Sequence, residues 1–331
     1  MTGRVWFSTA LICGLMAALL LALMLGQYPL SLAQVWQSLS TGGRSDTPAD
    51  LVIWSVRLPR LVAATLVGAS LAAAGATYQA MFRNPLVSPD ILGVSAGAGL
   101  GAMLAIFLVL PLAGIQLFAF VGGLIAVGLV YGVSLSARQH DPLLVLVLAG
   151  VAVGTFLGAG ISLIKILADP YTQLPTMTFW LLGGLNTVSY TELAWALPFI
   201  LAGLVPIVLL RWRINLLSLS ETEAQSLGVN TAQLSVLLIF CATLLTAATV
   251  SFTGIIGWVG LVIPHIARLC VGAEFSRLLP TSLVLGAIFL LLTDTLARNV
   301  GHMEMPLGVL TALIGAPFFL YLLVKGGASE R

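Results

Sequence analysis

The chain has 331 residues, of which 59% are hydrophobic and only 8% are charged, and its mean hydropathy is +1.09. Soluble domains carry about a quarter charged residues, so this composition excludes an ordinary soluble domain and indicates a protein built for the lipid bilayer. A formal net charge of +2, on basic residues that are scattered singly, argues against nucleic acid as a partner. The three cysteines are far apart, which argues against a disulfide framework or a cysteine metal site.

Ten apolar runs predict an all-α polytopic membrane protein, with one transmembrane domain covering residues 1–331. The first run is about 21 residues long, which is longer than the core of a signal peptide and long enough to span. The eighth is shorter and is broken by Gly257, Gly260 and Pro264. The expected spans lie at about residues 5–25, 60–81, 91–110, 115–136, 142–166, 193–210, 231–250, 255–268, 278–297 and 306–324.

The distribution of lysine and arginine predicts ten crossings with both termini in the cytoplasm. With this topology nine basic residues lie inside and five lie outside, in agreement with the positive-inside rule. Without the short eighth span, Arg268, Arg277, Lys325 and Arg331 would move outside and the bias would reverse. The eighth run is therefore expected to cross.

Residues 57–102 are unusually rich in Gly, Ala, Ser and Thr for membrane spans. Small residues let helix backbones approach closely, so the second and third spans are expected to form the packed heart of the bundle. The run GVSAGAGLG at residues 93–101 lies inside an apolar span, and we interpret its glycines as packing positions rather than as a phosphate-binding loop.

Two segments between the spans are expected to form helices that do not cross. Residues 167–192 have an apolar part too short to span, which favours an interfacial or re-entrant helix on the outer side. On the cytoplasmic side, the polar piece 211–230 contains Ser220 and Glu223 at the spacing of a capping box, and Gly228 is expected to end this helix. A helix of two turns is not stable alone in water, so it must pack on its own bundle or on a partner.

The sequence carries no motif for bond-making chemistry, such as a Walker loop, HExxH or GxSxG. We therefore predict no catalytic site. No series of Asp, Glu and His residues crosses the membrane to carry protons, and Asp294 is expected to pair with Arg298 near the outer end of the ninth span. The energy for any transport must come from elsewhere.

A series of short motifs follows one order along nearly the whole chain. They are Arg57-Leu58-Pro59-Arg60, Gly68 to Gln79, Arg83-Asn84-Pro85-Leu86, Leu92 to Ser95, Leu182-Gly183-Gly184, Leu227-Gly228, Gly254 to Arg268, Glu304 to Gly308 and Gly315 to Phe319. In this order and at these membrane depths, the sequence resembles the FecCD/BtuC-type permeases, the membrane subunits of type II ABC importers for iron–siderophore, haem and cobalamin.

The resemblance implies a BtuC-like fold of ten helices in the bacterial inner membrane. It also implies the partners, which are a second permease subunit (a copy of this chain or a paired homologue), two cytoplasmic ATPase subunits and a soluble substrate-binding protein outside. It implies no cofactor on this subunit, because ATP and Mg²⁺ belong to the ATPase. Transport would proceed by alternating access.

The resemblance also assigns roles to residues at both membrane faces. The cytoplasmic helix at about 216–228 would couple to the ATPase, through Leu217, Ser218, Leu219, Ser220, Glu221, Glu223, Ala224, Leu227 and Gly228. An ordinary loop helix folded on the bundle is the alternative. At outer span ends, Arg57, Arg60 and Arg298 resemble the arginines that pair with glutamates of the binding protein, with anchoring at the membrane interface as the alternative.

The translocation pathway is implied along the fifth span and at the cytoplasmic ends of spans two to five. The expected gate residues are Asn84, Pro85, Leu86, Val87, Asp141, Pro142 and Leu143. The expected pathway residues on the fifth span are Gly150, Gly154, Gly158 and Ser162, although helix packing alone would explain the glycines equally well.

Several functions remain open from the sequence. Ser88 to Gly93 resembles siderophore permeases more than cobalamin or haem permeases, which favours an iron(III)–siderophore-type chelate. The alternatives within the family are haem, cobalamin or another metal complex. Outside it, an ion-coupled secondary transporter would need buried coupling charges, and an intramembrane enzyme would need a convergent set of catalytic side chains.

Overall fold

The computed structural model describes residues 2–44, 47–136, 142–301 and 303–326, and this part of the chain is helical, with no strand. The helices are α1 (Thr2–Met24), α2 (Leu32–Thr41), α3 (Pro48–Asp50), η1 (Leu51–Arg57), α4 (Leu58–Met81), η2 (Pro89–Leu92), α5 (Val94–Phe107), α6 (Leu112–Ser136), α7 (Pro142–Leu167), α8 (Gln173–Leu182), α9 (Tyr190–Leu209), α10 (Arg211–Asn215), η3 (Leu216–Ser218), α11 (Glu221–Ser226), α12 (Thr231–Thr253), α13 (Val259–Val271), α14 (Phe275–Asn299) and α15 (Leu307–Gly326).

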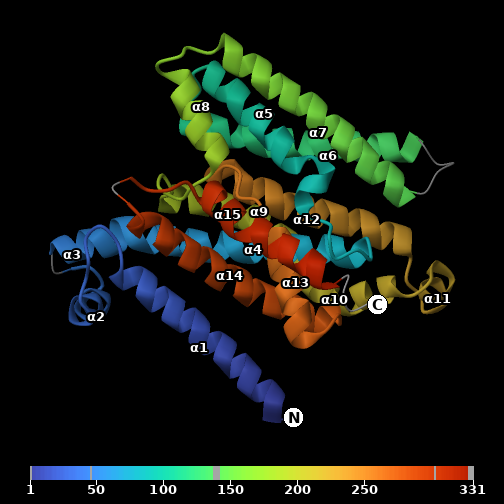
Figure 1. Cartoon of the computed structure of the whole chain (residues 1–331), viewed down its shortest axis with the longest axis horizontal. Helices are drawn as coiled ribbons and strands as arrows, with labels where there is room; N and C mark the ends of the chain where they lie inside the picture. The colour runs from blue at the N-terminus through green and yellow to red at the C-terminus, as the bar shows by residue number, and fades with distance from the viewer. Residues whose placement is uncertain (1, 45–46, 137–141, 302, 327–331) are drawn as a thin grey trace.

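Each expected apolar run falls on a helix. Within the described residues, seven helices are long and apolar enough to cross a membrane, and α5, α13 and α15 are shorter apolar helices at the positions of the third, eighth and tenth expected spans. The number of crossings and the side of the termini stay predictions. Figure 1 shows α2 and α3 at one end of the bundle, and α10, α11 and the end of α15 at the other.

The core of the molecule forms around α4, α12 and α14. In both α4 and α12, 78% of the apolar window is buried, compared with 17% in α1. A Cβ at Gly68 of α4 would lie 2.2 Å from the carbonyl oxygen of Gly286 in α14, and one at Gly75 would lie 1.8 Å from that of Gly260 in α13. Backbones meet directly at these crossings, so the expectation of close packing by small residues is confirmed.

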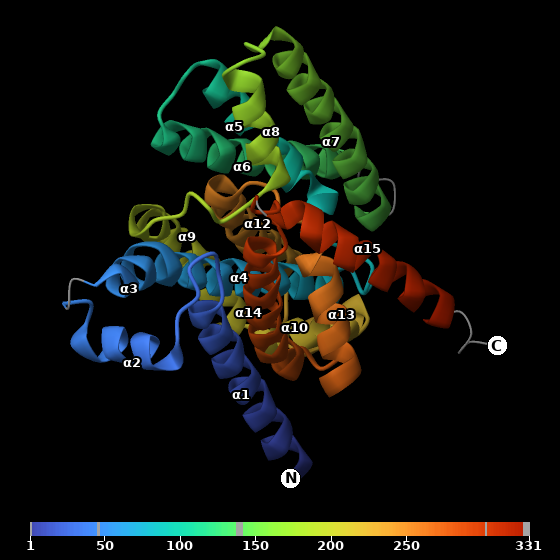
Figure 2. The same cartoon turned by 60° about the vertical axis from the view of Figure 1, so that its left-hand side comes forward.

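The third span packs in the same way against α6. A Cβ at Gly97 would lie 2.3 Å from the carbonyl oxygen of Gly122, and one at Gly101 would lie 2.0 Å from that of Phe118. Gly97 and Gly101 therefore serve helix packing, whereas Gly93 supplies a left-handed residue, with φ +73, before α5. Helices α5, α6, α7 and α8 lie together on one flank of the core (Figures 1 and 2).

The expected re-entrant segment contains α8, which ends against two other helix ends. The amide of Gly184 donates to the carbonyl of Thr253 at 2.8 Å, and the amide of Leu307 donates to that of Gly183 at 2.9 Å. These bonds join the end of α8, the end of α12 and the start of α15. Non-helical backbone in a membrane protein must be satisfied inside the protein, and these bonds satisfy it where the three helices end or begin.

The outer segment before α4 differs from expectation. Residues 26–56 lie between the first two expected spans, and α2 forms there behind a capping box of Ser31 and Gln34. A continuous helix of 34 residues then runs from Pro48 to Met81, so the second span begins well before residue 60. The sequence carries the capping signals of these helices, Thr47 with Asp50 included. A segment this polar does not stand out as helical from its hydropathy.

Candidate functional site: two ends of the bundle

The connection between α9 and α12, which the sequence predicts on the cytoplasmic side, folds into three short helices. The expected single helix at 216–228 is instead η3 and then α11, because Ser220 adopts an extended conformation and caps α11. The amide and the hydroxyl of Ser220 donate to Glu223 Oε2 at 3.0 and 2.7 Å, which confirms the expected capping box. Gly228 follows the helix with φ +80, in the conformation expected of a residue that ends a helix.

The ionised carboxylate of Glu223 strengthens this cap at neutral pH. The hydroxyl of Ser220, and then its amide, hold the pKa of Glu223 below its ordinary value. A carboxyl whose folded pKa is lowered stabilises the fold above its unfolded pKa, and this contribution is lost as the pH falls through the folded pKa. The cap is therefore charged and complete at physiological pH.

The side chains of the coupling segment, which we define as residues 216–228, divide between the bundle and the surface of the molecule. Leu217 and Ala224 are buried and hold the segment to the bundle, whereas Leu227 is 60% exposed. Ser218, Ser220 and Glu223 are exposed, Leu219 is partly exposed, and Gly228 is exposed beyond the helix. Glu221 is the first residue of α11, and its side chain lies outside the described part. Among the described side chains of this segment, Leu227 is the large apolar one that the bundle leaves exposed.

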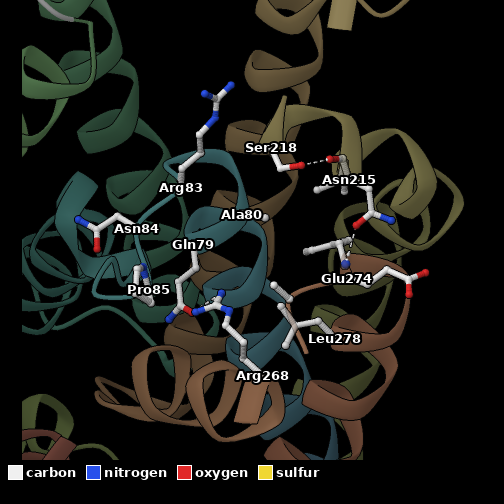
Figure 3. Close-up of a pocket in the computed structure, with 13 residues that line it drawn as sticks. Gln79, Ala80, Arg83, Asn84, Pro85, Asn215, Ser218, Arg268, Glu274 and Leu278 are labelled. Carbon is white, nitrogen blue, oxygen red and sulfur yellow. Dashed lines mark hydrogen bonds between the residues drawn. The ribbon is translucent and has the colours of Figure 1, made fainter. Parts of the chain in front are cut away.

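A recess of about 660 Å³ lies beside the coupling segment. Its walls come from the end of α4, from α10 and η3, and from the connection between α13 and α14 (Figure 3). Gln79 and Arg268 point toward each other on one side, where Arg268 Nη2 donates to Gln79 Oε1 at 3.2 Å. On another side, Asn215 Oδ1 accepts the backbone amide of Phe275 at 2.6 Å and so ties α10 to α14.

The expected gate turn at Asn84 to Val87 lies at the rim of this recess. Asn84 Oδ1 accepts the amide of Leu86 at 2.9 Å, which closes a tight turn. Leu86 is 44% exposed, while Val87 is buried. Asn84 and Pro85 line the recess itself. Of the remaining gate residues, Asp141 lies outside the described part of the chain, and Pro142 and Leu143 begin α7 with side chains that also lie outside it.

The four expected pathway residues of α7 do not share one environment. A Cβ at Gly150 would lie 1.9 Å from the carbonyl oxygen of Ile91, so this glycine serves the contact of α7 with η2. Gly154 and Gly158 have no atom within 4 Å of a Cβ position, and Ser162 is exposed. Because they are spaced four residues apart, Gly154, Gly158 and Ser162 form one small, neutral and uncovered face.

At the outer end, the three arginines expected to meet a docking partner are almost entirely buried. The exposed fractions of Arg57, Arg60 and Arg298 are 3%, 7% and 7%. Arg57 donates to the carbonyl oxygens of Leu23 and Tyr28. Arg298 donates to those of Ala22 and Leu25 at 3.3 and 3.4 Å. The two guanidinium groups therefore cap the last turn of α1, where helix carbonyls lack partners.

Carboxylates complete this outer cluster, which we define as Arg57, Arg60, Arg298, Asp294 and Glu304. Asp294 Oδ1 lies 2.8 Å from Arg60 Nε, and its Oδ2 lies 3.1 Å from Arg298 Nε. The second of these contacts confirms the pair expected from their spacing. Glu304 Oε2 lies 2.9 Å from Arg60 Nη1 and is the accessible member, with 39% of its side chain exposed. The docking role of the arginines stays a prediction.

Two groups of functional interest were missed from the sequence. Glu304 is distant in sequence from Arg60, and only the fold brings them together. Arg83 directly precedes the gate turn. From the sequence it was used only as a basic residue at a span end, in assigning the membrane topology. Among the described residues, no group of three His, Cys, Asp or Glu side chains is placed to hold a metal ion.

Comparisons with known proteins agree with this arrangement. The profile of the FecCD transport family matches residues 14–325. The molybdate import system permease protein MolB of Haemophilus influenzae is 41% identical over 317 residues, which cover 94% of each chain. A Helicobacter pylori relative named "Probable iron chelatin transport system permease protein" is 40% identical over 326 residues, 96% of this chain and 98% of the relative. A solved metal-chelate type ABC transporter in an inward-facing conformation aligns with a TM-score of 0.87 and 38% identity, covering 98% of this chain and 99% of the other.

Proposed function

Because this chain belongs to the FecCD transport family of ABC transporter permeases, we propose that it is the membrane-spanning subunit of an ATP-driven importer for an iron(III)–siderophore-type chelate. A soluble binding protein delivers the chelate outside, and the permease releases it into the cytoplasm by alternating access. The complex contains a second permease subunit and two ATPase subunits, which bind ATP and Mg²⁺. It lies in the bacterial inner membrane, with ten spans and both termini in the cytoplasm.

The observation that carries this proposal is the coupling segment. Helix α11 has six residues and is fixed by a complete capping box, yet Leu227 beside it remains 60% exposed. A helix of this length depends on a surface to remain folded, and a groove on the ATPase would cover its exposed side. A transporter that works alone has no need for such a segment.

The uncovered face of α7 supports a pathway for a bulky solute. Gly154, Gly158 and Ser162 present neither charge nor large side chains to the space beside them. In the proposed assembly, the same face of the second permease subunit lies opposite. A neutral, small-residue lining suits a cargo that must pass without being held tightly, since tight binding would slow its release.

The outer cluster supports a specific form of docking. Three arginines face two carboxylates, so the cluster keeps a net charge of +1. Glu304 occupies Arg60 at the surface, and a carboxylate of the binding protein would compete with it. Docking would therefore exchange one carboxylate for another, which contributes orientation and encounter rate more than affinity.

The cargo is the least constrained part of the proposal. The relatives cited above are named for molybdate and for iron chelatin, and the neutral face of α7 does not discriminate between an oxyanion and a chelate. Haem, cobalamin, another metal complex or molybdate are the alternative cargoes. Calorimetry of the cognate binding protein with a ferric siderophore, haem, cobalamin and molybdate would select among them.

The decisive experiment is transport in proteoliposomes. Uptake of cargo from the loaded binding protein should require the ATPase subunits and ATP. Uptake that persists without the ATPase would instead indicate an ion-coupled secondary transporter. The structure offers little support for that alternative, because the buried acid of the outer cluster, Asp294, is neutralised by two arginines rather than exposed to a pathway.

A further inference from the structure

The residue that joins the end of α4 to the gate turn is Arg83. Its backbone has φ +50, in the left-handed region. A side chain is disfavoured there because its Cβ approaches the following carbonyl, and glycine is the usual choice. A strained arginine at the start of a turn persists only when its side chain makes compensating contacts.

The side chain of Arg83 bonds to the coupling segment. Its Nε donates to the carbonyl oxygen of Leu217 at 2.6 Å, and its Nη2 donates to that of Leu219. Leu217 lies in η3, and Leu219 directly precedes Ser220, the cap of α11. One guanidinium group thus connects the turn at Asn84 to the backbone that leads into α11, over a sequence separation of 134 and 136 residues.

The last turns of α4 are also attached to a different helix. Gln79 Nε2 donates to the carbonyl of Leu261 in α13 at 3.2 Å. The Oε1 atom of the same side-chain amide accepts a hydrogen bond from Arg268. In Figure 3, Gln79 and Arg268 face each other, whereas Arg83 points away from them. The recess lies between Ser218 of the coupling segment and the connection of α13 to α14, while Asn215 holds the preceding α10 to Phe275.

We propose that Arg83 is a positioning residue that transmits movement of α11 to the gate turn at Asn84 to Val87. When the ATPase displaces α11, the two bonds to the carbonyls of Leu217 and Leu219 draw the turn with it. Backbone carbonyls are suited to this role because, unlike side chains, they cannot rotate away from the guanidinium independently of the segment. This inference rests on the proposed function, since it assumes that an ATPase moves α11.

Replacing Arg83 by glycine separates the effect of its backbone conformation from the effect of its side-chain hydrogen bonds. Arg83→Gly keeps a backbone that favours φ +50 and removes both hydrogen bonds, so the turn is expected to fold. Arg83→Lys keeps the charge but loses the paired donors. Arg277→Ala is the matched control, because it removes one exposed cytoplasmic charge whose partner is the exposed Glu274.

The readout is cargo transported per ATP hydrolysed in proteoliposomes with the ATPase and binding protein. For Arg83→Gly we expect ATPase association and basal hydrolysis within about twofold of the unmodified protein, but about tenfold less cargo per ATP, because two charge-assisted bonds are lost. Arg83→Lys should fall between, and Arg277→Ala should match the unmodified protein. Normal cargo per ATP in Arg83→Gly would overturn the proposal. Loss of ATPase association would also overturn it, because Arg83 would then only support the docking surface.

A distance measurement tests the linkage without any cargo. Spin labels at Leu86→Cys and Ser226→Cys, with the three native cysteines replaced by alanine, report the separation of the gate turn and α11. In the complex with the ATPase, this distance should stay constant when ATP and vanadate are added, and should change in Arg83→Gly. A distance that changes equally in both proteins would contradict the linkage. If the unmodified complex moves no cargo at all, the proposed function fails instead, and the distances still decide whether Arg83 couples the two segments.

Discussion

The two ends of α4 use the same residue type for opposite purposes. At the outer end, Arg60 is buried and lies between carboxylates of α14 and of the chain before α15. At the inner end, the side chain of Arg83 is exposed and, among the described residues, bonds only to the carbonyls of one short segment, beside a recess of about 660 Å³. The difference shows that burial and the number of elements contacted, rather than the charge, decide whether an arginine fixes a bundle or links a movable part to it.

Neutralising the buried carboxylate of the outer end should have the largest effect on stability. Asp294→Asn leaves Arg60 and Arg298 buried without their shared counter-charge. Removing one partner of a buried ion pair costs about 3–5 kcal/mol, so the thermal midpoint in detergent should fall sharply. A midpoint close to that of the unmodified protein would show that the outer end is not the fixed end.

Between the two ends, a methyl group on α4 should be less disruptive but clearly measurable. Gly68→Ala places its Cβ 2.2 Å from the carbonyl oxygen of Gly286, so α4 and α14 must separate. Overpacking of this kind costs about 1–3 kcal/mol. Gly154→Ala is the control, because no atom lies within 4 Å of its Cβ position. Equal thermal midpoints for the two variants would mean that α4 does not depend on this crossing.

At the inner end, Glu223→Arg should weaken association with the ATPase and leave docking of the binding protein intact. It removes the half of the capping box that Glu223 supplies, and it reverses a charge on the exposed surface. Glu223→Gln retains a side chain that can complete the box and should associate almost normally. Pull-down of the ATPase from membranes measures both, and unchanged recovery with the arginine variant would show that α11 is not the coupling helix.

The smallest effect is expected for the exposed member of the outer cluster. Glu304→Gln removes a carboxylate that is 39% exposed, and such ion pairs contribute about 1 kcal/mol or less. Stability should therefore hardly change. Docking of the binding protein should instead tighten, because Arg60 would be free for an incoming carboxylate. Surface plasmon resonance against the immobilised permease would detect this, and weaker docking would argue that Glu304 itself is the contact.

The helical architecture and the capped helix were predictable because their causes are local. Apolar runs of spanning length, the Ser220 and Glu223 spacing, and the glycines of residues 93–101 are each visible within a short window. The split at Ser220 was also local, since a cap residue that begins α11 cannot continue η3 as an α-helix.

The roles of the arginines were harder to predict, because they depend on partners far away in the sequence. Arg57 stands at a span end in the sequence, as an interfacial anchor or a docking residue would. In the structure it is buried, because the π-helical turn η1 precedes α4 and α1 ends against it. Gly150 shows the same limit, since its spacing matches that of Gly154 but η2 covers only the first of them.

The capping of α1 has a consequence for how the protein is made. Arg298 reaches the carbonyls of Leu25 and Ala22 across 273 and 276 residues of sequence. Arg57 can cap the last turn of α1 early in synthesis, but the bonds from Arg298 form only after most of α14 has been made. Completion of this cap is thus a late event, and a chain truncated before Arg298 would leave the end of α1 more open to proteolysis.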